Sequence, residues 1–347
     1  MELDLGRNNI TGAIPDNFPP TCVLSYLDLN RNSLQGRIPK SLQSCELLEF
    51  MNVGDNIIYD TFPCMLPSTL RVLVLQSNKF HGEVRCRTNW PDLQIVDISS
   101  NNFSGSLESI NFSSWTAMTQ LRHESSSFYT SGVILTVKGL RRELGDIWSD
   151  FGTIDFSSNN FRGRIPNAIG DLITLRHLNF SHNAFNGTIP TSFGQLSKLE
   201  SLDLSRNQVS GVISPELGGL TFLSFLNLSY NKLVGQIPNG PQLRTFTADS
   251  FKGNPGLCGF NDSISCSRRD HNNSSPGEVE NGEEKREIEW TFVFAALGYV
   301  VGLGIIVWLL LFCRSFRVKY FGKIEEVVED ILVARDRRRA RNRARTQ

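Results

Sequence analysis

Residues 154–159, 178–183, 202–207 and 226–231 read IDFSSN, LNFSHN, LDLSRN and LNLSYN. Each phrase ends in an asparagine that lies 24 residues after the previous one. Five related phrases precede them, and the nine phrases end at Asn8, Asn32, Asn56, Asn78, Asn101, Asn159, Asn183, Asn207 and Asn231. The spacings are 24, 24, 22, 23, 58, 24, 24 and 24 residues, so one interruption divides a ladder of nine asparagines.

This period and this phrase predict an α/β-type leucine-rich repeat solenoid with short parallel strands on its concave face. Alternate side chains of a strand point to opposite faces, so we expect Leu27 and Leu29 to point inward and Asp28 toward the concave face. The asparagine amide can bond backbone groups of the neighbouring turn that would otherwise be buried without partners. One repeat cannot bury its own apolar side, so stacking supplies the core.

A second phrase follows most of the asparagines, in the forms ITGAIP, LQGRIP, FRGRIP, FNGTIP, VSGVIS and LVGQIP. Its glycine permits a tight bend and its proline fixes the next backbone step. This form resembles the plant-specific leucine-rich repeat, although repeat three has Tyr59 and Asp60 at the glycine step. We expect five repeats over residues 1–106, four over residues 151–238 and a C-terminal cap over residues 239–266.

Residues 291–313 (TFVFAALGYVVGLGIIVWLLLFC) contain no charged side chain. As a helix they span ~34 Å, enough for a bilayer core of ~30 Å, so they predict one transmembrane helix. Basic residues such as Arg314 and Arg317 follow this segment and acidic residues precede it. The positive-inside rule therefore predicts an acidic extracellular stalk over residues 267–290, a short basic cytoplasmic tail over residues 314–347, and a single-pass plasma-membrane protein with an extracellular N-terminal part.

Glycosylation and cysteine patterns agree with an extracellular front. The acceptor pattern N-x-S/T lies only before the apolar segment, at Asn9, Asn102, Asn111, Asn179, Asn186, Asn227, Asn261, Asn272 and Asn273. Asn179 and Asn227 fall at strand positions expected to face the concave side, so either they are unmodified or a ligand binds elsewhere. Counting from the ladder asparagines places cysteines on adjacent turns or in one short loop, which predicts the disulfides Cys22–Cys45, Cys64–Cys86 and Cys258–Cys266.

The gap in the ladder lacks the strand phrase over residues 107–150, which we interpret as an insertion, or island. Residues 129–139 alternate as a strand does, and residues 140–150 suit a helical turn or two. Within this stretch Tyr129 is followed after eight residues by Lys138 and Gly139, and four repeats follow.

These features resemble those of the plant leucine-rich repeat receptor-like proteins, which have an ectodomain and a span but no kinase. The phrases CELLEFMNVGDN, DTFPCML, LRVLVLQSNKFHG, LQIVDISSNNFSG and DSFKGNPGLCG are similar to those of the Verticillium-resistance type, and the resemblance covers residues 1 to about 320. It implies ligand or co-receptor contact at Tyr129, Lys138 and Gly139, against the alternative that they only pack the island. It also implies that the stalk meets an adaptor kinase and that Gly298 and Gly302, a GxxxG pair, contact a partner helix.

No motif indicates catalysis, a cofactor, a metal site or nucleic-acid binding; the five histidines are scattered and the tail is too short for a kinase. The prediction is a cell-surface receptor that recognises an extracellular peptide, protein or glycan, in defence against pathogens, and signals through adaptor and co-receptor leucine-rich repeat receptor kinases. Alternatives are a polygalacturonase-inhibitor-like binding protein and a non-functional receptor remnant. The start MELDLG resembles neither a signal peptide nor a cap, so we expect an N-terminally truncated chain.

Overall fold

The computed structural model describes residues 1–120, 132–145, 148 and 150–259. All of them belong to one compact unit, Met1–Arg269, and a second unit, Asp270–Gln347, lies outside the described part. Within the described residues, no helix has the length and apolar character needed to cross a membrane. The predicted stalk, span and tail, with Gly298 and Gly302, lie outside these residues.

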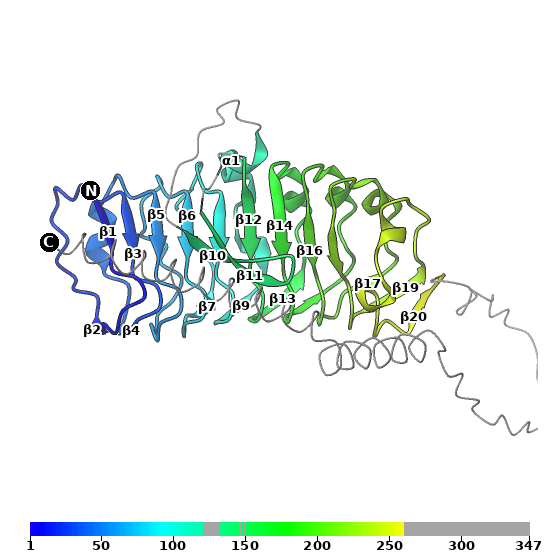
Figure 1. The fold of residues 1–347 in the computed structure, drawn as a ribbon, viewed down its shortest axis with the longest axis horizontal. Helices are drawn as coiled ribbons and strands as arrows, with labels where there is room; N and C mark the ends of the chain where they lie inside the picture. The colour runs from blue at the N-terminus through cyan, green and yellow to red at the C-terminus, as the bar shows by residue number, and fades with distance from the viewer. Residues whose placement is uncertain (121–131, 146–147, 149, 260–347) are drawn as a thin grey trace, which may run out of the picture. The chain divides into compact units, whose positions relative to one another are not determined.

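Nine parallel strands, one for each ladder phrase, form the main sheet of the solenoid (Figure 1). Their bounds, in sheet order, are β1 Glu2–Asp4, β3 Tyr26–Asp28, β5 Phe50–Asn52, β6 Val72–Val74, β8 Ile95–Asp97, β12 Gly152–Asp155, β14 Leu175–Asn179, β16 Ser201–Asp203 and β18 Phe225–Asn227. The order follows the chain, and β8 pairs directly with β12 across the interruption. The predicted solenoid with parallel strands is therefore confirmed.

A second set of short strands follows the asparagines, at the glycine step of the repeat. These strands are β2 Thr11–Ala13, β4 Ser33–Gln35, β7 His81–Glu83, β9 Asn102–Gly105, β13 Asn160–Arg164, β15 Ala184–Asn186, β17 Ser210–Gly211, β19 Lys232–Gln236 and β20 Gly256–Cys258. Gly163 has φ +86° and lies against the Ser106 side chain, which explains the glycine of this phrase. Repeat three has no described strand here; instead the Asp60 carboxylate accepts hydrogen bonds from the backbone N–H groups of Ile38 and Thr61 at 3.0 and 2.8 Å.

Short helices complete the turns on the other side of the core. They are η1 Lys40–Ser44, η2 Leu107–Ser109, η3 Phe112–Ser114, α1 Thr116–Thr119, η4 Asn167–Asp171, η5 Thr191–Gln195, η6 Pro215–Gly219, η7 Leu243–Thr245 and η8 Ala248–Ser250. Proline immediately precedes η1, η4 and η5. The proline of the second phrase therefore marks where each of these helices begins.

The asparagine ladder joins consecutive turns. Asn207 is typical, since its Nδ2 donates to the carbonyls of Phe180, Leu204 and Ser205 at 2.9, 3.1 and 3.2 Å. Its Oδ1 accepts from the backbone N–H of Phe185 at 3.0 Å. The residue before each ladder asparagine has a positive φ, +54° at Arg206 for example, which turns the chain off the strand.

The cap continues this ladder with a tenth asparagine that the sequence pattern did not reveal. Asn254 donates to the carbonyls of Leu228 and Phe251 and accepts from the N–H of Leu233, at 2.9, 2.8 and 3.0 Å. Gly253, with φ +75°, takes the place of the preceding turn residue. The cap therefore closes the solenoid by repeating its backbone pattern without its strand phrase.

The predicted start of the island at residue 107 is wrong. Leu107, Phe112, Trp115 and Met118 are buried in the solenoid core, so the fifth turn continues at least to residue 118. The prediction failed because this stretch completes the turn with short helices that carry no repeat phrase. The helical turn expected over residues 140–150 is also wrong, since the chain there begins with strand β11, Leu140–Leu144, which pairs antiparallel with β10, Val133–Val137.

Candidate functional site: the island hairpin on the concave face

Strands β10 and β11 form a hairpin, here called the island hairpin, whose two-residue turn is Lys138–Gly139. Val137 pairs with Leu140 on either side of the turn. Lys138 has φ +53° and Gly139 has φ +74°, the pattern of the tight turns that match strand twist. The Lys-Gly pair that the family resemblance singled out therefore has a structural role as the turn itself.

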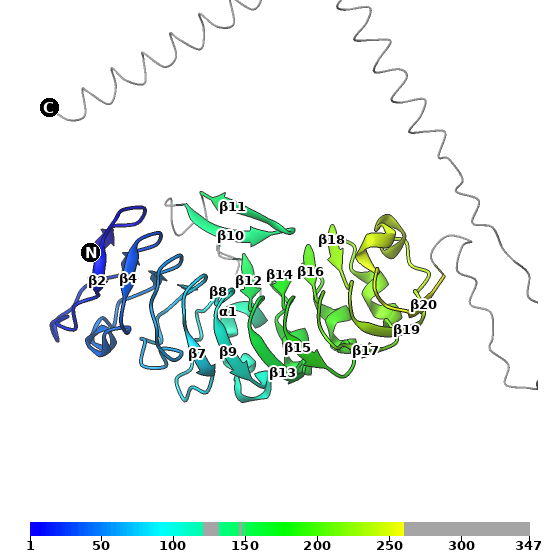
Figure 2. The ribbon, with the colours of Figure 1, turned by 90° about the horizontal axis from the view of Figure 1, so that it is seen from below.

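The hairpin lies across the concave side of the solenoid (Figure 2). Its inner side chains, Val133, Leu135 and Val137, are buried. They form a second apolar cluster with the first or third strand residues of repeats two to five, namely Tyr26, Phe50, Val72, Val74 and Ile95. At about 1.5–3 kcal/mol for each fully buried aliphatic side chain, this cluster is the main source of hairpin docking.

Polar contacts align the hairpin along its length. The Gln76 amide donates to the Ile134 carbonyl at 3.1 Å, and Arg141 pairs with Asp55 at 2.8 Å. Arg7 and Glu143 form a further ion pair at 2.5 Å. These ion pairs are largely exposed, so each contributes only about 0–1 kcal/mol and helps mainly to set the position of the hairpin.

Four charged residues, here called the tip cluster, fasten the turn to the last repeats. Lys138 Nζ lies 3.1 Å from Glu200 Oε2, and Arg176 bridges Glu200 Oε1 at 2.9 Å and Asp150 Oδ2 at 2.5 Å. Burial alone would raise the pKa of Glu200, but hydrogen bonds from Arg176 and Lys138 outweigh it and lower that pKa. The tip cluster therefore joins the hairpin turn, through Lys138, and the end of the island, through Asp150, to Arg176 in β14 and to Glu200, which directly precedes β16.

Gly139 also touches the last strand. A Cβ at this glycine would lie 3.2 Å from two ring carbons of Phe225, so a side chain at this position would press against the ring. Sequence reasoning missed Glu200, Arg176 and Phe225 as partners of the island. A signal was present in the strand position that aligns with Ile95. This position is occupied by Tyr26, Phe50, Val72 and Ile95 of the apolar cluster in repeats two to five, and by the polar residues Thr153, His177 and Ser201 in the next three.

A row of carboxyl and amide groups runs beside the apolar row on the concave face. Asp97 and Asp155 are neighbours in this row, and both are buried. Burial, followed by the charge of Asp155, raises the pKa of Asp97 well above its usual range, while burial raises the pKa of Asp155 to about 6. Next to them, burial lowers the pKa of His177 to about 4. Asp155 and His177 are therefore both mostly neutral near pH 5.

Two disulfides join neighbouring turns of the solenoid. Cys22–Cys45 and Cys64–Cys86 have Cα–Cα distances of 4.7 and 5.2 Å, and both pairs are those expected from the sequence. Cys258 is disulfide-bonded as well, and its expected partner Cys266 lies outside the described residues.

Within the described residues, the predicted glycosylation acceptors occupy two different environments. Asn9, Asn102, Asn111 and Asn186 are exposed. Asn179 and Asn227 are half-buried in the main sheet, on the concave side as expected. Asn261, Asn272 and Asn273 lie outside the described residues, as does Tyr129 of the island.

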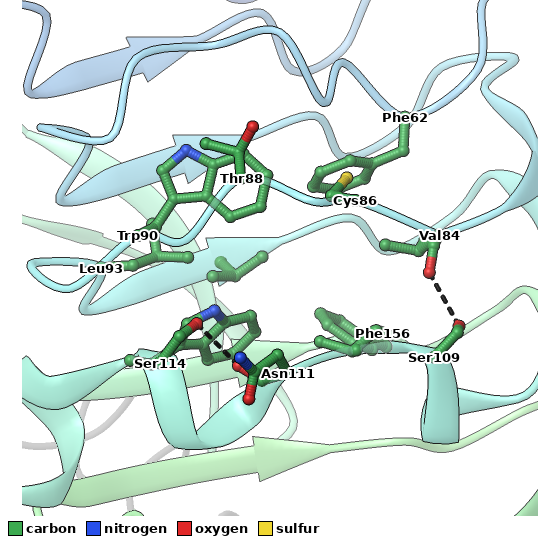
Figure 3. A pocket seen from close by; sticks show the side chains of 13 residues that line it. Phe62, Val84, Cys86, Thr88, Trp90, Leu93, Ser109, Asn111, Ser114 and Phe156 are labelled. Atoms are coloured by element: carbon green, nitrogen blue, oxygen red, sulfur yellow. Dashed lines mark hydrogen bonds between the residues drawn. The ribbon is translucent and has the colours of Figure 1, made fainter.

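Two hollows lie near the candidate site and the fifth turn. A mainly apolar, partly open cavity of about 20 Å³ lies beside the fifth turn, where Phe62, Trp90 and Phe156 line it (Figure 3). This volume is enough for about one water molecule. A surface cleft of about 360 Å³, here called the C-terminal cleft, lies between β18 and the cap. In the described part of the chain, no three His, Cys, Asp or Glu side chains are placed to hold a metal ion.

Comparison with known proteins agrees with this architecture. The leucine rich repeat family matches residues 173–233 in one form and residues 1–20, 23–45 and 152–172 in another. Receptor-like protein 33 of Arabidopsis thaliana is 47% identical over 83% of this chain and 33% of its own length. Receptor-like protein 35 of the same plant is 50% identical over 71% of this chain and 27% of its own length. The chain thus spans about a third of the length of the curated relatives it matches.

Solved structures show the same fold. The leucine-rich repeat ectodomain of the Arabidopsis thaliana membrane receptor kinase GASSHO1/SCHENGEN3, in complex with CASPARIAN STRIP INTEGRITY FACTOR 2, aligns with a TM-score of 0.55 and 28% identity over 74% of this chain and 30% of that one. A plant ice-binding protein aligns with a TM-score of 0.54 and 25% identity over 75% of this chain and 73% of that one. The relatives support the prediction that the chain is not an enzyme. The chain therefore belongs to the plant leucine-rich repeat receptor-like proteins.

Proposed function

We propose that this chain is part of a cell-surface receptor that recognises an extracellular peptide, protein or glycan and signals through partner receptor kinases, in pathogen defence. The observation that carries the proposal is the island hairpin docked on the concave face of a chain related to receptor-like proteins. The docked hairpin covers repeats two to five, and its Lys138–Gly139 turn lies beside Glu200, just before β16, and Phe225, at the start of β18. This arrangement favours contact with partners at the turn and at the last four repeats.

The contact surface in this proposal centres on the turn. The Lys138 side chain is about one-third exposed although its ammonium group pairs with Glu200. A partner carboxylate or glycan hydroxyl reaching this side chain would compete with Glu200 and weaken the tip cluster. Tyr129 and Gly139 complete the island contact in this proposal, as the family resemblance implies.

Signal transfer in this proposal uses segments outside the described residues. The stalk over residues 267–290 and the span over residues 291–313 would meet an adaptor receptor kinase, with Gly298 and Gly302 at the helix contact.

The test is co-precipitation from plant membranes, combined with surface biotinylation of the full-length protein. We expect surface labelling and recovery of an adaptor leucine-rich repeat receptor kinase. Changing Gly298 and Gly302 to leucine should abolish recovery, while the same change at the nearby Gly304 should not. Absence of surface labelling would refute the receptor proposal, and unchanged recovery with both glycines replaced would exclude this helix contact.

A further inference from the structure

The last strand of the main sheet is one of its two edge strands and has a neighbouring strand on one side only. β18 pairs with β16, and beyond it the cap takes the place of a further strand. The C-terminal cleft of about 360 Å³ opens there. The backbone bond from Leu228 N–H to the Ser250 carbonyl, at 2.7 Å, holds the cap wall against the strand.

The lining of this cleft combines aromatic rings with small polar groups. Phe225 and Phe246 supply phenyl rings from the strand and the cap. Hydroxyl, carboxyl and amide groups come from Thr245, Thr247, Asp249 and Asn227. The apolar ring faces of a sugar pack well on phenyl rings, and its hydroxyls need polar partners of this kind.

Asn227 is itself the acceptor of a glycosylation sequon, Asn227-Leu228-Ser229. Its Nδ2 makes only a long contact of 3.5 Å with Asp203 Oδ2. The other strand sequon, at Asn179, is placed differently: it lies between Asp155 and Asp203 in the interior of the sheet, and its Nδ2 donates to Asp155 Oδ2 at 3.1 Å. Of these two strand sequons, Asn227 therefore lines the C-terminal cleft, whereas Asn179 lies between two strands of the sheet.

We propose that Asn227 carries an N-linked glycan whose first sugars pack into the C-terminal cleft. In the transfer, the amide nitrogen bonds to the anomeric carbon of an oligosaccharide carried on a lipid diphosphate. The bond from that carbon to the diphosphate breaks, the diphosphate leaves with the electron pair, and the amide loses one proton. Transfer takes place on the unfolded chain, so the fold need only accommodate the product, and the cleft does so.

The inference rests on the proposed cell-surface location and narrows the proposed binding surface. A glycan in the cleft covers the outer side of Phe225, whose ring also faces Gly139 of the hairpin turn. The concave face is then closed by the hairpin over repeats two to five and by the glycan at repeat nine. A protein partner would reach the turn from the rim between them.

The test is glycopeptide mass spectrometry of the full-length protein purified from plant membranes, with endoglycosidase release under native conditions. We expect sugar on Asn227 and on the exposed Asn102, Asn111 and Asn186. Native release at Asn227 should be about tenfold slower than at Asn186, equal to it after denaturation, and faster in Phe246→Ala. Ser229→Thr keeps the sequon and should keep the sugar, whereas Asn227→Gln should remove it.

The outcomes separate this inference from the proposed function. Sugar on the exposed sites with none on Asn227 would overturn the inference and leave the surface location standing. Sugar on Asn227 that is released natively as fast as that on Asn186 would overturn the packing in the cleft. No sugar at any site would overturn both the inference and the surface location.

Discussion

Replacing Asn159 by alanine tests whether the ladder holds the solenoid together across the island. The Asn159 side chain is 8% exposed, and its Nδ2 donates to the carbonyls of Ile98, Phe156 and Ser157 at 3.0, 3.3 and 3.1 Å. Its Oδ1 accepts from the N–H of Phe103, 56 residues away, at 2.9 Å. Alanine removes all four bonds. The three carbonyls each keep a second donor, from Asn101, Asn183 and Ser100, whereas the Phe103 N–H loses its side-chain acceptor.

The magnitude follows from this bond set. Each buried hydrogen bond contributes about 1 kcal/mol net, and a buried group left without a partner costs about 1–3 kcal/mol. Two amide hydrogens serve three carbonyls, so the bonds are shared and do not add in full. We expect Asn159→Ala to lower the free energy of unfolding by about 3–5 kcal/mol. Asn159→Asp should cost more, since it brings a carboxylate against three carbonyl oxygens.

The assay is urea unfolding of the chain, followed by circular dichroism, with hydrogen exchange to locate the opening. Asn207→Ala is the matched comparison, because Asn207 makes the same set of bonds between two uninterrupted repeats. Asn186→Ala, at an exposed position, should change stability by less than about 0.5 kcal/mol in unglycosylated protein. A cost below about 1 kcal/mol for Asn159→Ala, with a full cost for Asn207→Ala, would refute the reasoning that the ladder bridges the island.

Three further predictions follow. Glu200→Gln should speed hydrogen exchange in the island hairpin and leave exchange in β1–β6 unchanged, because it weakens the tip cluster alone. Hairpin exchange as slow as in the parent protein would contradict that role. Asp155, with its pKa raised to about 6, stabilises the folded state at low pH, and this contribution is lost as the pH rises through 6. His177, with its pKa lowered to about 4, stabilises the folded state above pH 6.5, and this contribution is lost as the pH falls toward 4. The two contributions therefore oppose each other between pH 4 and 6.5. In denaturant titrations on acidification, Asp155→Asn should lose stability relative to the parent protein and His177→Gln should gain it, by about 3 kcal/mol each. Variants whose stability changes with pH in parallel with the parent protein would contradict this prediction. Replacing both Cys64 and Cys86 by serine should lower the free energy of unfolding by about 3 kcal/mol, as measured against the oxidised parent protein.

Much of the fold was predictable because it is local and periodic. The positions of the ladder asparagines predicted where the main strands lie, and counting from them placed Cys64 beside Cys86. Asn254 escaped this reasoning because the cap keeps the backbone pattern without the strand phrase. The boundary at residue 107 was misplaced because the fifth turn is completed by short helices that have no repeated signature.

The candidate site was predictable only in part. Lys138 and Gly139 were singled out by resemblance, and their backbone angles make them a hairpin turn. Their partners, Glu200 and Phe225, were not found, since they follow the Lys138–Gly139 turn by more than 60 residues and look like ordinary repeat positions.

The sequence by itself determined that this chain stacks repeats of about 24 residues, where each turn leaves its strand, and where the ladder breaks, because these features depend on residues that recur at a constant spacing. Only the tertiary structure decided that the island folds back over repeats two to five and that its turn meets the last repeats. The physical reason is that docking depends on apolar side chains far apart in the chain, Tyr26 and Leu135 among them, finding one shared buried surface.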